Sequence, residues 1–222
     1  MGSRRKPLAG VAFDRQRQAR RVLRGLRRLY PDAHCELDFS TPLELIVATI
    51  LSAQCTDKRV NQVTPGLFKR YRTAADYAAA DPAALEQEIR TTGFFRSKAA
   101  SLRAMAATLV ARFGGRVPRT MDELLELRGV ARKTANVVLG TAYGIPSGVV
   151  VDTHMRRVAY RLGLTDEKDP GKIERDLQAV VPRRAWIFFG HAMIWHGRRV
   201  CRAAAPDCPG CLLKTFCPKR GV

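Results

Sequence analysis

One predicted helix constrains the fold more than any other part of the sequence. At its start, Thr41-Pro42-Leu43-Glu44, a threonine hydroxyl caps the helix, a proline takes the first helical position and a glutamate completes a capping box. The residues that follow, up to Leu51, are apolar on nearly every side of such a helix. Because an exposed amphipathic helix would not tolerate that pattern, we predict a buried helix around which other elements pack.

The rest of the sequence also has the periodicity of helices. In residues 13–30, apolar side chains recur at spacings of three and four beside arginines, which is typical of an amphipathic helix. Breakers such as Gly114-Gly115 separate further apolar stretches, and no segment alternates as a strand would. We therefore predict the all-α class. Besides the helices at 13–30 and 41–51, further helices are expected near 57–71, 82–90, 95–113, 121–127, 131–143, 154–162, 170–180 and 184–200.

The charge of the chain points to a polyanionic partner. The sequence holds 39 Lys and Arg against 20 Asp and Glu, a net charge of +19, yet its 46% hydrophobic content is that of a globular chain. Nucleic acid is the first partner to consider, and an anionic membrane surface competes with it. Residues 1–12 lack an apolar period and are expected to form a flexible basic arm. Without a spanning or secretory segment, we expect an intracellular protein.

Four cysteines near the C-terminus suit one metal centre. Their spacing is C-x6-C-x2-C-x5-C, and the intracellular setting disfavours disulfides. Structural zinc usually shows two Cys-x-x-Cys pairs, and this segment has one, whereas an iron–sulfur cluster accommodates varied spacing. Spacing leaves both metals open for the four candidate ligands, Cys201, Cys208, Cys211 and Cys217.

A tight hairpin between two helices is a candidate phosphate site. A second capping box at Thr120 opens a short helix, Gly129 should end it, and another helix begins almost at once. The free N–H groups and the dipole at the start of this second helix can hold a phosphate. Lys133 falls in its first turn, where the dipole and Arg132 oppose protonation of the amine and favour a nucleophile that forms a Schiff base.

Asp152 follows the apolar run 149–151 and precedes another predicted helix. An aspartate in this place is what a helix N-cap should be. Capping and catalysis are compatible roles, so Asp152 is a candidate for both. His154, His191 and His196 show no ligand-like spacing and are expected to be core or surface residues.

Together these motifs resemble endonuclease III of the helix-hairpin-helix DNA glycosylase superfamily. The resemblance covers nearly the whole chain and rests on four segments: the run from Leu51 to Asp57, the hairpin with Lys133-Thr134-Ala135-Asn136, the Val151-Asp152-Thr153-His154 segment and the cysteine spacing. It implies a two-lobed all-α fold. The six-helix domain would span about residues 35–145, and a discontinuous cluster domain would combine 13–34 with 146–222.

The same resemblance implies the chemistry. Lys133 would attack the sugar C1′ of a damaged nucleotide, Asp152 would assist base departure and proton transfer, and β-elimination would nick the strand. The four cysteines would ligate a [4Fe–4S] cluster. The expected substrate is damaged double-stranded DNA carrying oxidised pyrimidines, bound by a cytoplasmic, nucleoid-associated monomer that does not contact membranes.

A flipped base leaves a gap in the duplex that a side chain must occupy. Gln54 matches the glutamine of the family that fills this gap, and Phe94 lies near its wedge position, although a place in the core is the alternative for Phe94. The other expected DNA contacts are Arg128, Gly129, Val130, Ala131, Arg132 and Arg202, with Arg198 and Arg199 as further phosphate contacts.

Three departures from the family pattern concern the site. Ala131 replaces the second glycine of the hairpin and would be strained if that position needs positive φ. The loop from Lys133 to Asp152 is one residue longer than expected. Phe94 replaces an expected aliphatic wedge, so we hypothesise a changed lesion spectrum.

Three other interpretations compete with this one. A monofunctional, mismatch-directed adenine glycosylase is the nearest, but that family usually lacks the lysine and adds a C-terminal domain. A non-catalytic DNA-binding metal protein would use the hairpin without reacting, and a redox role of the cluster is compatible with the sequence.

Overall fold

The computed structural model describes residues 9–222, with side chains from Asp14 onward. Its chain divides into two compact units. The hairpin unit is Cys35–Ser147, and the cysteine unit combines the residues up to His34 with Gly148–Val222. The second boundary thus lies two residues beyond the expected 145. Of the predicted basic arm, residues 1–8 lie outside the described residues, whereas 9–12 belong to the first helix, which begins earlier than expected.

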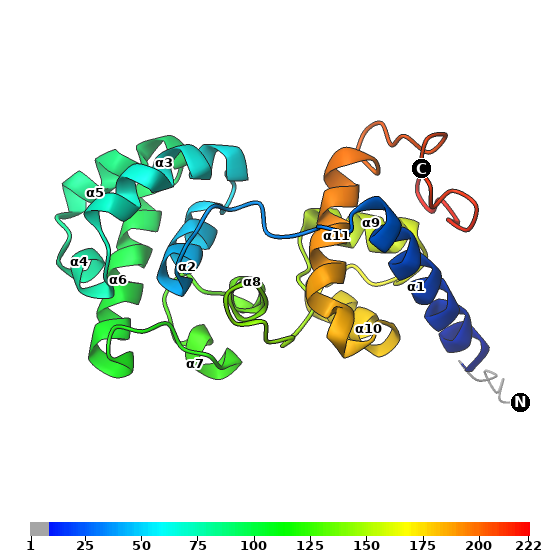
Figure 1. The fold of residues 1–222 in the computed structure, drawn as a ribbon, viewed down its shortest axis with the longest axis horizontal. Helices are drawn as coiled ribbons and strands as arrows, with labels where there is room; N and C mark the ends of the chain where they lie inside the picture. The colour runs from blue at the N-terminus through cyan, green and yellow to red at the C-terminus, as the bar shows by residue number, and fades with distance from the viewer. Residues whose placement is uncertain (1–8) are drawn as a thin grey trace, which may run out of the picture. The chain divides into compact units, whose positions relative to one another are not determined.

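The hairpin unit is built around the helix predicted to be buried. In α2 (Pro42–Leu51), six side chains from Leu45 to Leu51 are buried, and the Thr41–Glu44 capping box forms as the sequence predicts. The surrounding helices, followed in Figure 1, pack on this core. They are α3 (Asp57–Arg70), α4 (Ala74–Ala79), α5 (Pro82–Ile89), the 3₁₀ helix η1 (Arg90–Thr92), α6 (Phe95–Phe113), α7 (Met121–Leu125) and α8 (Arg132–Tyr143).

Helix α4 was not predicted. It has only six residues, too few to show an apolar period, yet Thr73 and Asp76 close a full capping box at its start. Tyr77 of this helix is almost fully buried and stacks on Tyr71, with ring centroids 5.0 Å apart. The short helix therefore completes the core of the hairpin unit against α6.

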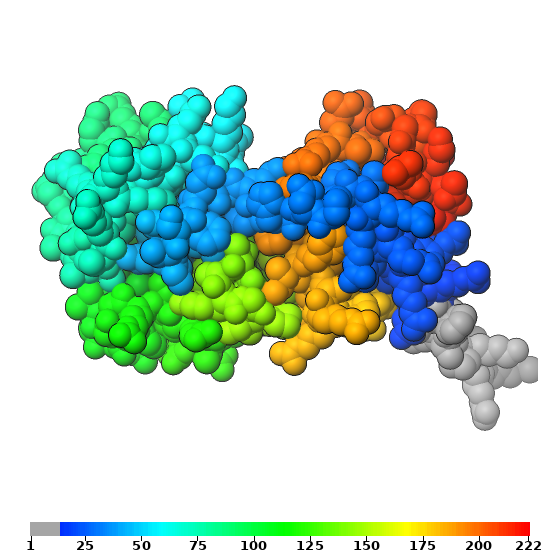
Figure 2. Space-filling model, in the orientation of Figure 1, coloured from blue at the N-terminus to red at the C-terminus, as the bar shows by residue number. Residues whose placement is uncertain are grey.

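The cysteine unit contains α1 (Ala9–Leu29), α9 (Thr153–Arg161), α10 (Pro170–Val180), the 3₁₀ helix η2 (Arg183–Ala185) and α11 (Trp186–Arg199). Helices α9 and α11 pack closely because Gly197 has no side chain; a Cβ there would lie 2.9 Å from the Cβ of His154. The C-terminal segment lies beside α1 at the surface in Figure 2. Gly25 permits this approach, since a Cβ there would lie 2.3 Å from Leu213.

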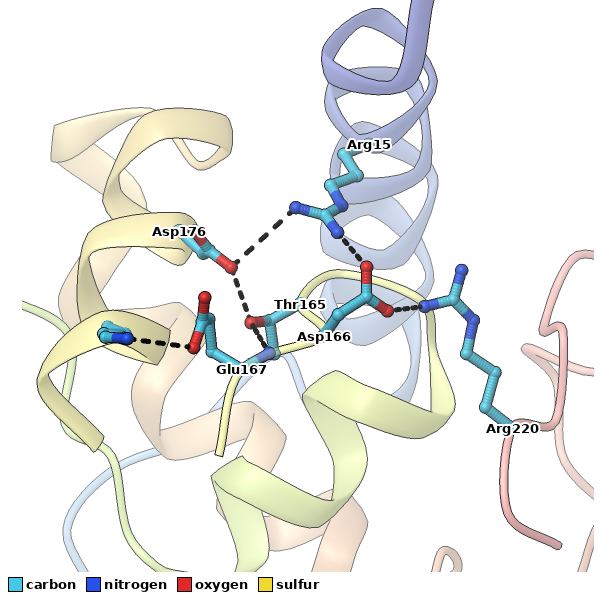
Figure 3. A network of polar contacts seen from close by, with 7 residues as sticks. Arg15, Thr165, Asp166, Glu167, Asp176 and Arg220 are labelled. Atoms are coloured by element: carbon cyan, nitrogen blue, oxygen red, sulfur yellow. Dashed lines mark hydrogen bonds and ion pairs between the residues drawn. The ribbon is translucent and has the colours of Figure 1, made fainter. Parts of the chain in front are cut away.

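A polar network fastens the C-terminal segment to the rest of the cysteine unit (Figure 3). Asp166 forms ion pairs with Arg15 of α1 and with Arg220 near the chain end. Asp176 of α10 accepts a hydrogen bond from Thr165 Oγ1 at 2.6 Å. The network thereby joins α1, α10 and the residues that follow the last cysteine.

All regular elements from residue 9 onward are helical, so the predicted all-α class is confirmed. None of these helices is long and apolar enough to cross a membrane.

Candidate active site and cysteine centre

The predicted hairpin connects α7 and α8. Gly129 has φ +84°, and a Cβ there would lie 3.1 Å from the Cβ of Ser101. Both facts favour glycine, because other residues rarely adopt this conformation and a Cβ at this distance would force Ser101 of α6 to shift. Val130 is buried, and its N–H donates to Leu127 O at 3.1 Å. Val130 therefore fixes the turn, while the backbone on either side of it faces outward.

The N-terminus of α8 carries no side-chain cap. Ala131 occupies the cap position without a hydroxyl or carboxylate, so the first-turn N–H groups keep the capacity to bind an anion. Lys133 is exposed in this turn, and its amine forms no hydrogen bond or ion pair with the described residues. Ala135 and Val138 anchor the opposite face of the helix in the core. The helix thus presents a free amine next to an anion site.

Asp152 is the N-cap of α9, as its place in the sequence predicts. Its Oδ1 accepts the N–H of Met155 at 2.7 Å. The side chain is half-buried, and Oδ2 forms no hydrogen bond with the described residues of its unit. One carboxylate oxygen therefore holds the helix while the other is open to a ligand. Asp152 belongs to the cysteine unit and Lys133 to the hairpin unit.

Gln54 and Phe94 share an unusual backbone conformation. Their φ angles are +52° and +47°, in the left-handed region that non-glycine residues rarely adopt. Both side chains are exposed, and Phe94 keeps 66% of its surface accessible. The alternative that Phe94 belongs to the core is therefore wrong. Each residue stands on a tight loop of the hairpin unit and projects a side chain into solvent.

The arginines proposed as DNA contacts differ in their surroundings. Arg199 is held within the cysteine unit, with its guanidinium carbon 3.8 Å from the ring centroid of Trp195. All five of these arginines are nevertheless exposed: Arg128, Arg132, Arg198, Arg199 and Arg202.

The four C-terminal cysteines line one cavity of the cysteine unit. All four are free thiols, so the disulfide alternative is wrong for them. Leu213 N–H donates to Cys211 Sγ at 3.4 Å, and Lys219 N–H donates to Cys217 Sγ at 3.4 Å. Burial raises the pKa of the Cys211 and Cys217 thiols. Because burial disfavours the thiolate forms of Cys211 and Cys217, thiolates at these two positions would need a compensating positive charge, which a metal centre would supply.

A buried arginine and a buried histidine support this cavity, and no motif in the sequence predicts a role there for either residue. Arg161 donates to the carbonyl of Arg202 at 2.7 Å, to that of Ala203 at 3.0 Å, and to Cys201 Sγ at 3.5 Å. His196 lies with Nε2 3.7 Å from Cys211 Sγ, and burial lowers its pKa to about 4. His196 is a core histidine, as predicted, but its contact with a cysteine has no signal in the spacing.

Comparison with known proteins decides the family. The HhH-GPD superfamily model of base excision DNA repair proteins matches residues 47–183. Endonuclease III of Synechocystis is 52% identical over 211 residues, 95% of this chain and 96% of the relative. The chain belongs to the endonuclease III family.

Solved structures of endonuclease III bound to DNA agree with this placement. A non-covalent endonuclease III–DNA complex superposes with a TM-score of 0.88 at 44% identity, covering 92% of this chain and 95% of that one. A trapped endonuclease III–DNA covalent intermediate gives the same score and identity over 92% and 96% of the two chains. The predicted helix-hairpin-helix fold is confirmed.

One departure from the endonuclease III pattern is harmless to the backbone. Ala131 has φ −89° and ψ 169°, an extended conformation that any residue adopts. The expectation of strain at this position is therefore wrong, because the hairpin requires positive φ at Gly129 and not at Ala131.

Proposed function

We propose that this protein is a bifunctional DNA glycosylase and AP lyase of base excision repair, which removes oxidised pyrimidines from double-stranded DNA and nicks the strand. The observation that carries the proposal is the exposed, unpaired amine of Lys133 in the uncapped first turn of α8. It occurs in a chain 44% identical to an endonuclease III that has been trapped covalently on DNA.

The lysine chemistry follows from this placement. The Lys133 amine attacks C1′ of the damaged nucleotide, and the C1′–N bond breaks as the base leaves with the bonding electrons and takes up a proton. Opening of the sugar ring gives a protonated Schiff base. Loss of a C2′ proton then forms a C2′–C3′ double bond and expels the 3′ phosphate, which nicks the strand. Water finally releases the lysine.

Other residues of the site support these steps. The second oxygen of Asp152 receives and returns the protons that the base and the sugar exchange. Phosphates bind at the first turn of α8 and at the exposed Arg128, Arg132, Arg198 and Arg202, with Gly129 and Ala131 letting the backbone approach. Gln54 and Phe94 fill the gap left by the extruded nucleotide, because both project from exposed, strained loops.

We also propose that the cysteine cavity holds a [4Fe–4S] cluster. In the described part of the chain, no three His, Cys, Asp or Glu side chains gather as they would around a single metal ion. Tetrahedral zinc draws its sulfurs to within about 4 Å of one another, whereas a four-iron cluster is larger. Four thiols around one cavity, with N–H donors at the sulfurs of Cys201, Cys211 and Cys217, fit the cluster better. When bound, it supplies a redox-active centre that links both ends of the C-terminal segment.

Borohydride trapping tests the catalytic proposal. The purified protein is incubated with duplexes that carry one thymine glycol or one abasic site, with and without borohydride, and resolved by denaturing electrophoresis. We expect a covalent adduct on both duplexes with borohydride, and a nick without it. Lys133→Gln should lose adduct and nick but still bind DNA. Lys168→Gln removes the same charge at another exposed position and should retain both.

The other outcomes of the trapping experiment would change the proposal in different ways. Nicking of the abasic duplex alone would reject thymine glycol as a substrate and keep the lyase. No adduct on either duplex, in protein with an intact cluster, would overturn the bifunctional proposal in favour of a monofunctional or non-catalytic protein. Because its substrate is chromosomal DNA, we place the protein in the cytoplasm at the nucleoid, and we expect a monomer.

A further inference from the structure

A buried lysine outside the catalytic hairpin joins two loops of the hairpin unit. Lys98 lies in α6 and is only 5% exposed. Its Nζ donates to the carbonyl of Leu51 at 2.7 Å and to that of Thr92 at 2.8 Å. It forms no ion pair with a carboxylate within the described residues. The function proposed above makes no use of this residue.

Both acceptors are the ends of helices. Leu51 is the last residue of α2, and Thr92 is the last residue of η1. Carbonyls at such ends lack partners within their own helix, and a nearby cation suits the negative end of the dipole. Among the described residues, no donor other than Lys98 reaches either carbonyl. The Lys98 side chain therefore caps the C-terminal ends of both α2 and η1, and it links the two ends through its amine.

The two capped ends lead directly into the two strained loops. Gln54 follows Leu51 by three residues, and Phe94 follows Thr92 by two. Each has a left-handed backbone conformation that costs roughly 1–2 kcal/mol and persists only where the surroundings enforce it. Lys98 holds the second loop twice, because its own N–H also donates to the carbonyl of Phe94 at 3.0 Å.

A lysine is a costly choice for a purely structural contact at this place. Burial lowers the pKa of Lys98, opposed in part by the nearby Cys55, so the charged form is disfavoured relative to water. Two carbonyls that end separate helices could each be satisfied by a local turn or a hydroxyl. What a long amine adds is a fixed link between two loops that are far apart in the sequence.

We propose that Lys98 is a positioning residue that couples the Gln54 and Phe94 loops. It holds the Gln54 and Phe94 side chains in a fixed relative position, so that both enter the opened duplex together. The proposal rests on the gap-filling roles of Gln54 and Phe94 proposed above. Without the coupling, each loop would relax from its left-handed conformation independently, and the two side chains would no longer be held ready for the same gap.

The test measures duplex opening separately from phosphate binding and from lysine chemistry. The substrate is a duplex with a tetrahydrofuran abasic analogue opposite 2-aminopurine, whose fluorescence rises when that base is unstacked. We expect Lys98→Met to lower the equilibrium constant for opening roughly tenfold, the effect of losing about one net hydrogen bond. Affinity for undamaged duplex should stay within about twofold of the original protein, because phosphate contacts dominate it. Borohydride trapping on a single-stranded abasic oligonucleotide, which has no gap to fill, should be unchanged.

Met105→Ala is the matched control, since Met105 is fully buried in the same helix, and truncating it destabilises the unit without removing the Lys98 hydrogen bonds to either loop. Its opening constant should match that of the original protein. The Gln54→Ala/Phe94→Ala double variant should lose most of the fluorescence rise, and adding Lys98→Met should then remove little more. Should Lys98→Met fail to fold, Lys98→Gln, which keeps one amide donor, is assayed in the same way and should give an intermediate loss.

Three results would overturn the coupling: opening unaffected by the Lys98 variants, equal loss in Met105→Ala, or full additivity with the Gln54 and Phe94 substitutions. If the Gln54→Ala/Phe94→Ala variant itself opens DNA normally, the gap-filling roles fail and the coupling fails with them. Absence of any trapped adduct would instead refute the lysine chemistry, while the opening data would still decide the role of Lys98.

Discussion

Asp152 has two roles in our account, and substitution separates them. Asp152→Ala removes the oxygen that accepts the Met155 N–H at 2.7 Å and the charge at the N-terminus of α9. Loss of a cap costs about 1 kcal/mol, and loss of the charge–dipole attraction costs roughly 0.5 kcal/mol more. Asp152→Asn keeps a capping oxygen and should lose only the second amount. For a chain of this size, the melting temperature should fall by roughly 3–6 °C for Ala and 1–2 °C for Asn.

The catalytic effect should follow a different order. Both variants lack a carboxylate that can accept a proton, so both should lower the single-turnover excision rate by about 10² to 10⁴. Asp169 provides the control, because it caps α10 in the same unit by accepting the Lys172 N–H at 2.9 Å. Asp169→Ala should reproduce the stability loss of Asp152→Ala while leaving excision unchanged.

Thermal unfolding and single-turnover excision on a thymine glycol duplex measure the two effects. Near-normal excision by Asp152→Asn would refute the proton-transfer role and leave only the cap. Equal melting temperatures for the Asn and Ala variants would refute the cap energetics.

Three further predictions concern the hairpin, DNA binding and the cysteine cavity. Gly129→Ala should weaken DNA binding about tenfold or more in a titration, because positive φ and the contact with Ser101 together cost roughly 2 kcal/mol. Gly144→Ala is the control: its φ is +65° but the space around it is open, and binding should be unchanged. The logarithm of the DNA association constant should fall linearly with the logarithm of salt concentration, and Arg132→Ala should reduce the slope by about 1; a flat line would contradict phosphate binding. Arg161→Leu should speed loss of the visible iron–sulfur absorbance under a chelator, relative to the exposed-site control Arg156→Leu, and equal rates would argue against support of the Cys201 loop by Arg161.

Capping residues and apolar patterns in the sequence were sufficient to predict most of the helices. The Thr41 capping box and the apolar run after it predicted α2 and its burial, since both signals act within one turn. Helix α4 was not predicted, because six residues are too few to show the apolar periodicity of a helix, although the Thr73–Asp76 capping box marks its start. The place of Asp152 as an N-cap was likewise a local inference, and the structure confirms it.

Local sequence patterns could not predict which distant residues form hydrogen bonds with each other in the fold. Lys98 and Arg161 bond mainly to backbone carbonyls, and a carbonyl has no residue identity for a sequence pattern to reveal. The backbone at Ala131 was misjudged for a related reason: the family pattern contains two glycines, but the sequence alone does not say which of them needs positive φ. The packing of Gly129 against Ser101 supplies that answer.

The distribution of backbone strain links fold and function in this chain. Within the described residues, three non-glycine positions have positive φ: Gln54, Phe94 and Lys219. Two project the side chains proposed to enter DNA, and the third donates its N–H to Cys217 Sγ. Such conformations persist only where neighbours enforce them, so each should have a strong local restraint. Lys98 provides that restraint for the first two. The third should depend on the [4Fe–4S] cluster that we propose at Cys217, so that removing the cluster would free the backbone at Lys219. Faster amide hydrogen exchange at residues 217–220 after chelation, without a change at Gln54 or Phe94, would follow; equal exchange in both states would show that the strain at Lys219 has another cause.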